Sequence, residues 1–351
     1  MHAFVMRDIG VGGRERVADP TPSRGDVIIA PAYSGLCGTD VHMFHEGTLT
    51  RKSSLPVVMG HEFVGTVVEI GSGDQVRPYG ETDQLRVGDH VSVEPLLPCN
   101  SCSQCLRGRS NLCSDWSHLG ILDDGCWADL VRVPAVRATK LPDGVSLYDA
   151  ALAEPLACAV NFVVQRGRVR TGETVLIVGA GPIGLLSVAM AKAAGAERIL
   201  VSEPQANRRA SAERVGATLT IDPLAHDIVD ATRAATNGAG PDVVVEASGS
   251  STAVAQAIAA AAPGSRVVLS GLGSGGTTAL DTNSIVTKEL TVMGGFASRW
   301  AMSTGLAAIA AGHVRTDDLV TSVRPWSHAE QAMHDMVADP TTCKILFDHS
   351  L

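Results

Sequence analysis

Basic residues are in deficit in this chain. It has 28 Lys and Arg against 37 Asp and Glu, for a formal net charge of −9 at pH 7. A protein that binds nucleic acid by neutralising phosphates needs the opposite balance, so we expect no nucleic-acid partner. Aromatic residues are also scarce, at 4%, but 45% hydrophobic and 19% charged residues are typical of a folded globular protein. A length of 351 residues predicts two domains.

The sequence has no pattern of a membrane-spanning helix or of a signal peptide. One uncharged run, Val175 to Ala191, is interrupted by Gly179, Gly181, Pro182 and Gly184, which divide it into a strand, a turn and a helix. We therefore expect no membrane partner and a cytoplasmic protein. In a reducing compartment the eight cysteines are expected to be thiols or metal ligands rather than disulfides.

Residues 1–150 read mainly as β structure. Short β-branched runs, separated by Gly, Pro and Asp, predict strands at residues 26–33, 63–70, 90–93 and 128–133. The polar run 75–85 interrupts a tight turn and is interpreted as a surface insertion. The pattern then changes, because Ser146 and Asp149 resemble a capping box that opens an Ala-rich helix with a restart at Pro155.

From Glu173 onward, strands and helices alternate. Six uniformly apolar strands are predicted at residues 174–178, 198–201, 218–221, 242–246, 265–269 and 290–293. Helical stretches, 182–195 and 205–215 among them, separate most of these strands, which implies a parallel sheet covered on both faces. Six such strands fit a doubly wound dinucleotide-binding fold. A closing strand at 343–347 returns to the β character of the first part.

A glycine-rich turn follows the first of these six strands. Gly179 permits a tight turn, Gly181 lets a pyrophosphate approach the backbone, and Gly184 lets helix and strand pack closely. Pro182 and Ile183 begin the helix, whose N-terminus would face the phosphates. The turn therefore predicts a dinucleotide cofactor.

An acidic residue follows at the place that this cofactor requires. Glu203 ends the second strand, 19 residues past Gly184. A carboxylate there can hydrogen-bond both ribose hydroxyls and repels a 2′-phosphate, so NAD is favoured over NADP. The alternative is a solvated charge at a strand end. Arg208 and Arg209 leave NADP as an alternative cofactor, because they are basic residues near the expected ribose site. Arg208 fits equally well as a residue that lines the adenosine pocket.

Four cysteines lie within 15 residues at short gaps: Cys99, Cys102, Cys105 and Cys113. Two-residue spacers let a loop wrap one tetrahedral Zn²⁺ ion, and a site closed by four thiolates is structural rather than catalytic. The alternatives are an iron–sulfur cluster and surface cysteines without metal. We expect a structural zinc lobe at about residues 97–115.

A second set of metal-ligating residue types consists of Cys37, His61 and Glu62. A zinc ion held by a thiolate, an imidazole and an acidic residue can keep one position open, where it activates an alcohol or polarises a carbonyl. The His-Glu-x-x-His pattern of a zinc peptidase is missing. His61 and Glu62 alone are therefore weak evidence, and the interpretation depends on the other motifs.

Together these motifs resemble the zinc-dependent medium-chain alcohol dehydrogenases, in the polyol (sorbitol), butanediol and threonine dehydrogenase branch. The resemblance covers essentially the whole chain and rests on five segments, namely Cys37–His42, Gly60–Glu62, Cys99–Cys113, Glu154–Ala157 and Gly179–Gly184. It implies an α/β protein with two domains. These are a GroES-like, mainly-β catalytic domain at 1–153 and 297–351, and a Rossmann domain with a six-stranded parallel sheet at 154–296.

The resemblance also implies two zinc ions per chain, one structural and one catalytic. Cys37 and His61 would bind the catalytic ion, with Glu62 and Glu154 as its acidic neighbours. Cys158 lies one helical turn from Glu154 and is a further candidate ligand. Glu154 is favoured over Cys158 because it lies at the motif position and carboxylates suit zinc equally well.

The proton path and the nicotinamide contacts are implied in the same way. Asp40 would orient the zinc-binding histidine, Thr39 would accept the proton of the alcohol, and His42 would pass that proton to solvent. A hydride would pass to the nicotinamide ring. Leu272 and Phe296, in loops after the fifth and sixth strands, would flank that ring.

The expected activity is hydride transfer between NAD and a secondary alcohol or ketone, and a polyol, sugar alcohol or cyclitol is the favoured substrate. Two acidic zinc neighbours favour this branch, although the strand end 201–204 is similar to threonine dehydrogenases, so amino-alcohol oxidation is the alternative. The zinc ligands argue against a zinc-free quinone or enoyl reductase, and the intact proton path argues against a non-catalytic NAD-binding protein. The resemblance also suggests a homo-oligomer, either a dimer or a tetramer.

Overall fold

The computed structural model describes residues 1–51, 54–72, 84–272, 277–339 and 341–351. The chain forms two compact units. Unit 1 comprises Met1–Glu154, Gly305–Ala310 and Val320–Leu351, and unit 2 comprises Pro155–Thr304 and Ala311–Leu319. The predicted domain limits, after residues 153 and 296, stay a prediction. The predicted insertion at 75–85 lies, except for its last two residues, outside the described residues.

Unit 1 consists mainly of β structure. Its strands are β1 (His2–Asp8), β2 (Val11–Arg16), β3 (Asp26–Gly35), β4 (Val57–Val58), β5 (Glu62–Ile70), β6 (His90–Val93), β7 (Leu96–Leu97), β8 (Ser117–His118), β9 (Val131–Pro134), β10 (Ala138–Lys140), β17 (Val320–Pro325) and β18 (Lys344–Asp348). The main sheet has the order β10-β6-β5-β3-β18-β17, with β9 also paired to β3. The smaller sheets are β2-β1-β4 and β7-β8. The expectation of a mainly-β first part is confirmed.

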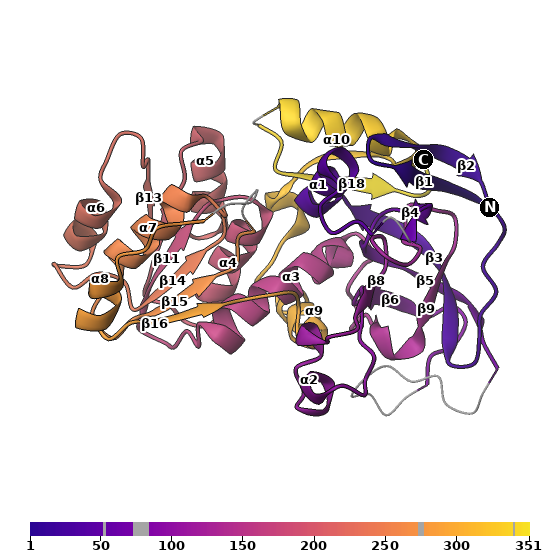
Figure 1. The fold of residues 1–351 in the computed structure, drawn as a ribbon, viewed down its shortest axis with the longest axis horizontal. Coiled ribbons are helices and arrows are strands. Elements are labelled where there is room, and N and C mark those ends of the chain that lie inside the picture. Colours follow the sequence, from indigo (N-terminus) through magenta and orange to yellow (C-terminus); the bar gives the residue numbers. More distant parts are fainter. Residues whose placement is uncertain (52–53, 73–83, 273–276, 340) are drawn as a thin grey trace. The chain divides into compact units, whose positions relative to one another are not determined.

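Among the described residues, three α-helices lie entirely within unit 1: α1 (Gly38–Glu46), α2 (Ser103–Leu106) and α10 (Ala329–Ala338). Helices α1 and α10 lie next to each other (Figure 1), with the rings of His45 and His334 5.1 Å apart between centroids. Helix α1 directly follows the central strand β3, which leads the chain into the Cys37 turn. The sheet thus supports the helix that carries the first group of candidate site residues.

A tryptophan organises the core of unit 1 beneath the candidate site. Trp127 is fully buried, and its ring meets Phe4 and Phe347 edge-on at centroid distances of 5.8 and 5.2 Å. Gly60 has φ +89°, and a Cβ at this position would collide with the Trp127 ring. Only glycine therefore lets the backbone pass the tryptophan. The close contact of Gly60 with Trp127 therefore fixes the backbone position of the next residue, His61.

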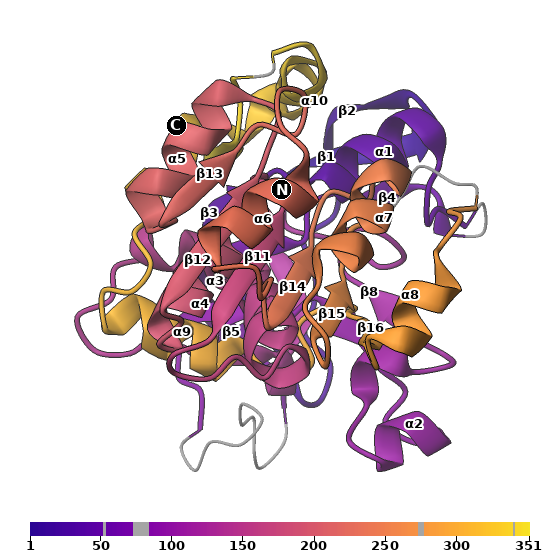
Figure 2. The ribbon, with the colours of Figure 1, turned by 90° about the vertical axis from the view of Figure 1, so that its left-hand side faces the viewer.

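Unit 2 contains a six-stranded parallel sheet. Its strands are β11 (Thr174–Val178), β12 (Arg198–Ser202), β13 (Leu219–Ile221), β14 (Val243–Glu246), β15 (Arg266–Leu269) and β16 (Thr291–Gly294). Figure 2 shows them side by side in the order β13-β12-β11-β14-β15-β16. The predicted doubly wound sheet is confirmed, and each strand limit lies within one residue of its predicted position.

Helices cover this sheet on both faces. The helices that lie within unit 2 among the described residues are α4 (Pro182–Ala193), α5 (Ala206–Val215), α6 (Ile228–Ala235), α7 (Ser251–Ala260) and α8 (Thr282–Thr287). Helices α3 (Ala153–Val160) and α9 (Met302–Ala310) have residues in both units. Helices α4 and α5 pack together, as do α6 and α7. Because the strand order reverses between β11 and β14, right-handed crossovers place the two pairs on opposite faces. Within the described ranges, no helix is both long and apolar enough to cross a membrane.

Candidate active site and metal centres

The first turn of α1 fixes the positions of a thiol and a carboxylate. Cys37 is the N-cap residue, and its Sγ accepts a hydrogen bond from the Thr39 backbone N–H at 3.5 Å. In return, the Cys37 backbone N–H donates to Asp40 Oδ2 at 2.9 Å. This is a capping box in which a cysteine and an aspartate replace the usual residue types. The cap therefore sets the orientation of both side chains.

The same aspartate also holds a histidine. Asp40 is fully buried, and its Oδ1 lies 3.1 Å from His61 Nδ1. A carboxylate only accepts hydrogen bonds, so Nδ1 carries the hydrogen and Nε2 is the nitrogen available to a metal. Burial lowers the pKa of His61, but Asp40 and Cys37 outweigh burial and raise that pKa well above its usual range. A metal ion at Nε2 would take the place of the proton.

Cys37, His61 and Glu62 form a close group. One ligand atom from each lies within 4.8 Å of the other two, and His61 and Glu62 are buried. Glu154 is also buried, and burial, followed by the negative charge of Glu62, raises the pKa of the Glu154 carboxyl to about 8. Two carboxyl groups that repel each other thus lie beside a thiol and an imidazole. A zinc ion, which accepts all three donor types, fits this group.

A buried lysine supports Glu62 from behind. Lys344, on β18, donates from Nζ to the Leu36 carbonyl at 2.9 Å and forms an ion pair with Glu62 Oε2. A Cβ on Gly35 would collide with the Glu62 carboxylate and crowd the lysine, so glycine makes room for the pair. Burial lowers the pKa of Lys344, but Glu62 and Cys37 outweigh it and raise that pKa, so the ammonium group stays charged. The sequence analysis did not single out Lys344.

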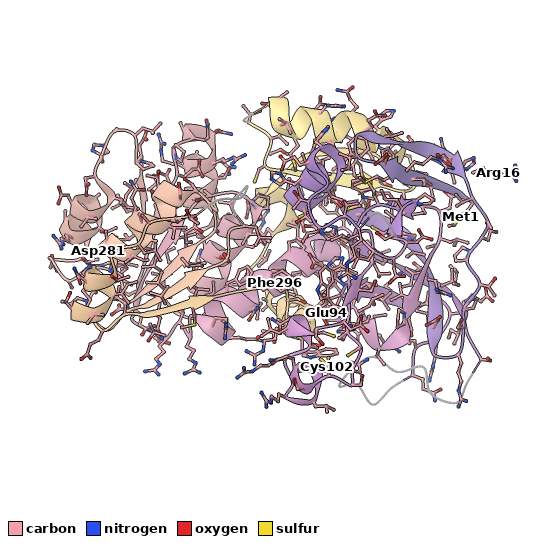
Figure 3. All side chains as sticks on the ribbon, viewed as in Figure 1. Met1, Arg16, Glu94, Cys102, Asp281 and Phe296 are labelled. Atoms are coloured by element: carbon pink, nitrogen blue, oxygen red, sulfur yellow. The ribbon has the colours of Figure 1, made fainter. Side chains whose placement is uncertain are left out.

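The four clustered cysteines also converge, in the lobe that contains α2. Figure 3 labels Cys102 there. Its sulfur lies 3.5 Å from that of Cys105 and 3.9 Å from that of Cys113, and the Cys113 and Cys99 sulfurs are 3.4 Å apart. Four thiolates about 2.3 Å from one tetrahedral zinc ion would be roughly 3.8 Å apart. The distances therefore fit one shared ion, and backbone N–H donors from Cys105 and Ser114 lower the pKa of Cys102 to about 5.

The glycine-rich turn has the geometry of a phosphate-binding loop. Gly179 has φ +96°, a conformation that favours glycine. A Cβ on Gly184 would collide with the Gly179 carbonyl, whereas a Cβ on Gly181 would meet no atom within 4 Å. Gly181 is the N-cap of α4, and Pro182 and Ile183 form its first turn. Two of the glycines thus serve the fold, and Gly181 leaves open space at a helix N-terminus.

Glu203 lies beside this turn. The carboxylate is buried, and it accepts hydrogen bonds from the Ala180 N–H at 2.8 Å and from the Gln205 N–H at 2.9 Å. A cavity of about 470 Å³ is lined by Glu203 and Arg208, together with Gly179 and residues of α7. Arg209 instead pairs with Asp222 at 3.1 Å. The structure therefore brings Glu203 and Arg208 to the same cavity at the carboxyl ends of the strands.

Two family models match this chain. "Alcohol dehydrogenase GroES-like domain" matches residues 23–143, and "Zinc-binding dehydrogenase" matches residues 182–311. L-threonine 3-dehydrogenase of Pyrococcus horikoshii is 40% identical over 276 residues, which cover 78% of this chain and 76% of the relative. The chain belongs to the zinc-dependent medium-chain alcohol dehydrogenase family. It is an enzyme that transfers hydride between an alcohol CH–OH group and a nicotinamide cofactor, with a small molecule as its substrate.

Other members of the family are similar over nearly the whole chain. "Probable D-xylulose reductase A" of Neosartorya fischeri is 36% identical over 322 residues, which cover 89% of this chain and 87% of the relative. The crystal structure of 2R,3R-butanediol dehydrogenase from Bacillus subtilis aligns with a TM-score of 0.89 and 30% identity over 99% of each chain. The relatives thus share the two-domain architecture of this dehydrogenase.

The structure places the residues of the expected proton path on one helix of this dehydrogenase. Thr39 is half-buried in the first turn of α1, and His42 lies one turn later on the same face. The side chain of His42 is 51% exposed, and its Nδ1 lies 3.1 Å from Glu46 Oε1. The helix thus leads from the metal-ligating group at Cys37 to solvent at His42.

The two residues expected to flank the nicotinamide lie in separate loops of the dehydrogenase. Leu272 follows β15 and is 70% exposed, and Phe296 follows β16 and is 39% exposed. The sequence analysis missed the residue that holds the second loop. Asn161 Nδ2 donates to the carbonyls of Phe296, at 3.2 Å, and of Ala297, at 2.7 Å. Asn161 begins a π-helical turn, a rare feature that often marks functional sites. No pattern in the sequence indicates this turn.

Cys158 and His118 have different relations to the metal-ligating group. Cys158 belongs to unit 2, and in the described part of the chain it joins no group of three ligand residues.

His118, on β8, was not singled out by the sequence analysis. Its ring centroid lies 5.3 Å from that of His61, and burial, followed by the charge of His61, lowers the pKa of His118 to about 3. His118 is therefore a neutral imidazole beside the candidate site.

Proposed function

We propose that the protein oxidises a secondary hydroxyl of a polyol, sugar alcohol or cyclitol, with NAD as the hydride acceptor. The observation that carries the proposal is the close group of Cys37, His61 and Glu62, with the buried Glu154 carboxyl beside it. A thiolate with one imidazole and two carboxyl groups is the ligand set that the resemblance implies for the polyol branch. With one of the two carboxyl groups as a direct ligand, this set supports a catalytic zinc ion with a position left for substrate.

In this proposal Cys37 and His61 hold the catalytic zinc ion, and Glu62 and Glu154 are its acidic neighbours. When bound, zinc acts as a Lewis acid that lowers the pKa of an alcohol and polarises a carbonyl. We favour Glu154 over Cys158, because the charges of Glu62 and His61 both act on the Glu154 carboxyl. Asp40 keeps the His61 ring in the tautomer that metal binding requires.

The chain's own residues then move the proton. The Thr39 hydroxyl accepts the proton of the substrate, and His42, one turn further along α1, releases it to solvent. Its exposed ring and its contact with Glu46 suit a group that exchanges protons with water. The cysteine lobe holds the second, structural zinc ion through Cys99, Cys102, Cys105 and Cys113, and its role is to fix the fold of residues 97–115.

The substrate proposal has a direct test. The relatives are named for threonine, xylulose and 2,3-butanediol. A panel of polyols, cyclitols, amino alcohols and primary alcohols, read by NADH absorbance, should give the highest kcat/KM with a polyol or cyclitol. The highest value with threonine would support the amino-alcohol alternative instead. No NADH with any alcohol would contradict the proposal.

Glu203 is proposed to bind the ribose hydroxyls of NAD, while Arg208 lines the adenosine pocket and Leu272 and Phe296 flank the nicotinamide. Glu203→Ala should raise the KM for NAD about tenfold and should lower the preference for NAD over NADP by a similar factor, because the carboxylate no longer repels a 2′-phosphate. The measurement is kcat/KM with each cofactor. Glu213→Ala, which removes an exposed carboxylate of α5, is the control and should leave the preference unchanged. An unchanged preference in Glu203→Ala would contradict the ribose role.

A further inference from the structure

The loop that follows β16, residues 295–300, has a strained backbone. Ala297, Arg299 and Trp300 have φ values of +54°, +45° and +59°. They are three of the eight non-glycine residues with positive φ in the described part of the chain. Residues other than glycine seldom adopt this conformation, and it persists only where the surrounding structure enforces it. The loop therefore needs contacts that hold its backbone in place.

The π-helical turn Asn161–Arg166 supplies these contacts from within the same unit. Asn161 is almost completely buried, and its Nδ2 donates to the carbonyls of Phe296 and Ala297, at 3.2 and 2.7 Å. One side-chain amide thus holds two successive carbonyls. The peptide group after Phe296 cannot rotate without breaking a hydrogen bond to this amide, which is buried away from water.

Two further contacts with the same turn fix the start of the loop. Arg166 donates from Nε and Nη2 to the Gly294 carbonyl oxygen, at 3.0 and 2.7 Å. Gly295 lies against the ring of Phe162, where a Cβ would come within 2.5 Å of a ring carbon. Glycine thus lets the loop approach the turn closely. The π-helical turn therefore holds the loop at its start and in its middle.

We propose that Asn161 is a positioning residue for hydride transfer, which fixes the loop of Phe296 so that the nicotinamide ring lies in one orientation. The inference rests on the proposed function, in which Phe296 flanks that ring. The Phe296 side chain is 39% exposed, so the core does not enclose it and its position depends on the backbone that carries it. Asn161 holds that backbone.

The orientation of the ring matters because hydride transfer depends strongly on geometry. A displacement of about 1 Å can lower the rate of a reaction about a hundredfold. Strained backbone and π-helical turns both occur often at functional sites, and here they contact each other. A contact that serves only the fold would affect the binding of the whole cofactor, whereas a contact that positions the nicotinamide affects that part alone. The two roles therefore predict different results.

The test compares NADH with ADP-ribose, which lacks the nicotinamide, in the zinc-loaded protein. Asn161→Ala removes the donor to both carbonyls. Calorimetry should show NADH binding weakened about five- to tenfold and ADP-ribose binding within about twofold of the wild type. The kcat for the best alcohol should fall about ten- to a hundredfold. Asn283→Ala, at an exposed asparagine of α8, is the control and should leave all three values unchanged.

Arg166→Met keeps the inference testable if Asn161→Ala does not fold. Arg166 is only half-buried, and methionine retains much of its apolar stem without the donors to Gly294. This variant should also weaken NADH binding and leave ADP-ribose binding unchanged, by a smaller factor than Asn161→Ala. Equal weakening of both ligands would show a purely structural role and overturn the inference. Unchanged NADH binding with unchanged kcat would overturn it as well.

Phe296→Ala separates a failure of this inference from a failure of the proposed function. If Phe296→Ala weakens the binding of NADH but not of ADP-ribose, the proposed nicotinamide contact is supported. Unchanged values in the Asn161 and Arg166 variants would then overturn the positioning role alone. If Phe296→Ala leaves NADH binding and kcat unchanged, the nicotinamide contact fails and the inference fails with it.

Discussion

Cys37→Ser is expected to lower alcohol-dependent NADH formation about a thousandfold or more. The serine hydroxyl can keep the helix cap, because it accepts from the Thr39 N–H as the sulfur does. It binds zinc far more weakly than a thiolate, so the Lewis acid that activates the alcohol is lost while the fold is kept. The measurement is kcat/KM for the best alcohol of the panel, together with circular dichroism to show that the variant is folded.

Cys158→Ser is the matched control for this change. Cys158 is the alternative to Glu154 as a ligand of the catalytic zinc ion. Unlike Cys37, it lies inside a helix, and among the described residues it joins no close group of ligand residues. The variant should keep activity within a few-fold of the wild type. Loss of activity in Cys158→Ser with little loss in Cys37→Ser would contradict the assignment of the ligands.

Lys344→Met is expected to lower the free energy of unfolding by about 3–5 kcal/mol. The side chains of Lys344 and Glu62 are almost entirely buried, at 1% and 3% exposure, so the variant leaves the Glu62 carboxylate without its partner. Methionine has a similar length and fills the space, so the loss reports the missing charge rather than a cavity. Urea denaturation of the zinc-loaded protein is the measurement.

Lys140→Met is the control, because Lys140 and Asp89 form an ion pair at 2.9 Å whose side chains are 28% and 24% exposed. An exposed pair of this kind contributes up to about 1 kcal/mol, so its loss should be small. Equal losses in the two variants would show that the Glu62 carboxylate does not depend on the lysine. The double change Glu62→Gln with Lys344→Met should recover part of the stability, since no unpaired charge remains.

The Rossmann part of the fold was predictable because each strand carries its own signal. Residues 174–178 and 198–202 are almost continuously apolar, as expected of parallel strands buried on both faces. Gly179, Gly181 and Gly184 end the first strand and open the helix through local backbone geometry. Local sequence was therefore enough to predict the strands within one residue and the place of the turn.

The first unit was less predictable because its elements depend on distant partners. The hairpin of β1 and β2 was missed, since Val11–Arg16 is polar and contains two glycines, and it becomes a strand only by pairing with β1. The helix expected after Ser146 is a 3₁₀ turn followed by α3 and a π-helical segment. The Ser146 contact with the Asp149 N–H is present at 3.1 Å, but it begins the 3₁₀ turn.

The candidate site likewise contains residues that a local sequence motif indicates and residues that only distant contacts bring into place. Cys37, His61 and Glu62 stand in short motifs of metal-ligating residue types, so local sequence indicates them. Lys344 lies 282 residues from Glu62 and has no motif of its own, so only the pairing of β18 with β3 brings it to the carboxylate. His118 depends likewise on the β7-β8 pair. Partners that arise from sheet topology leave no local pattern in the sequence.

The central claim is that one chain holds two zinc ions, of which one lies at Cys37 and His61. Metal analysis of the purified wild type and of Cys37→Ser tests it most directly. The account predicts close to two zinc ions per chain in the wild type and close to one in the variant, in which the ion bound by the cysteine lobe remains. A single zinc ion in the wild type, or two in Cys37→Ser, would contradict it.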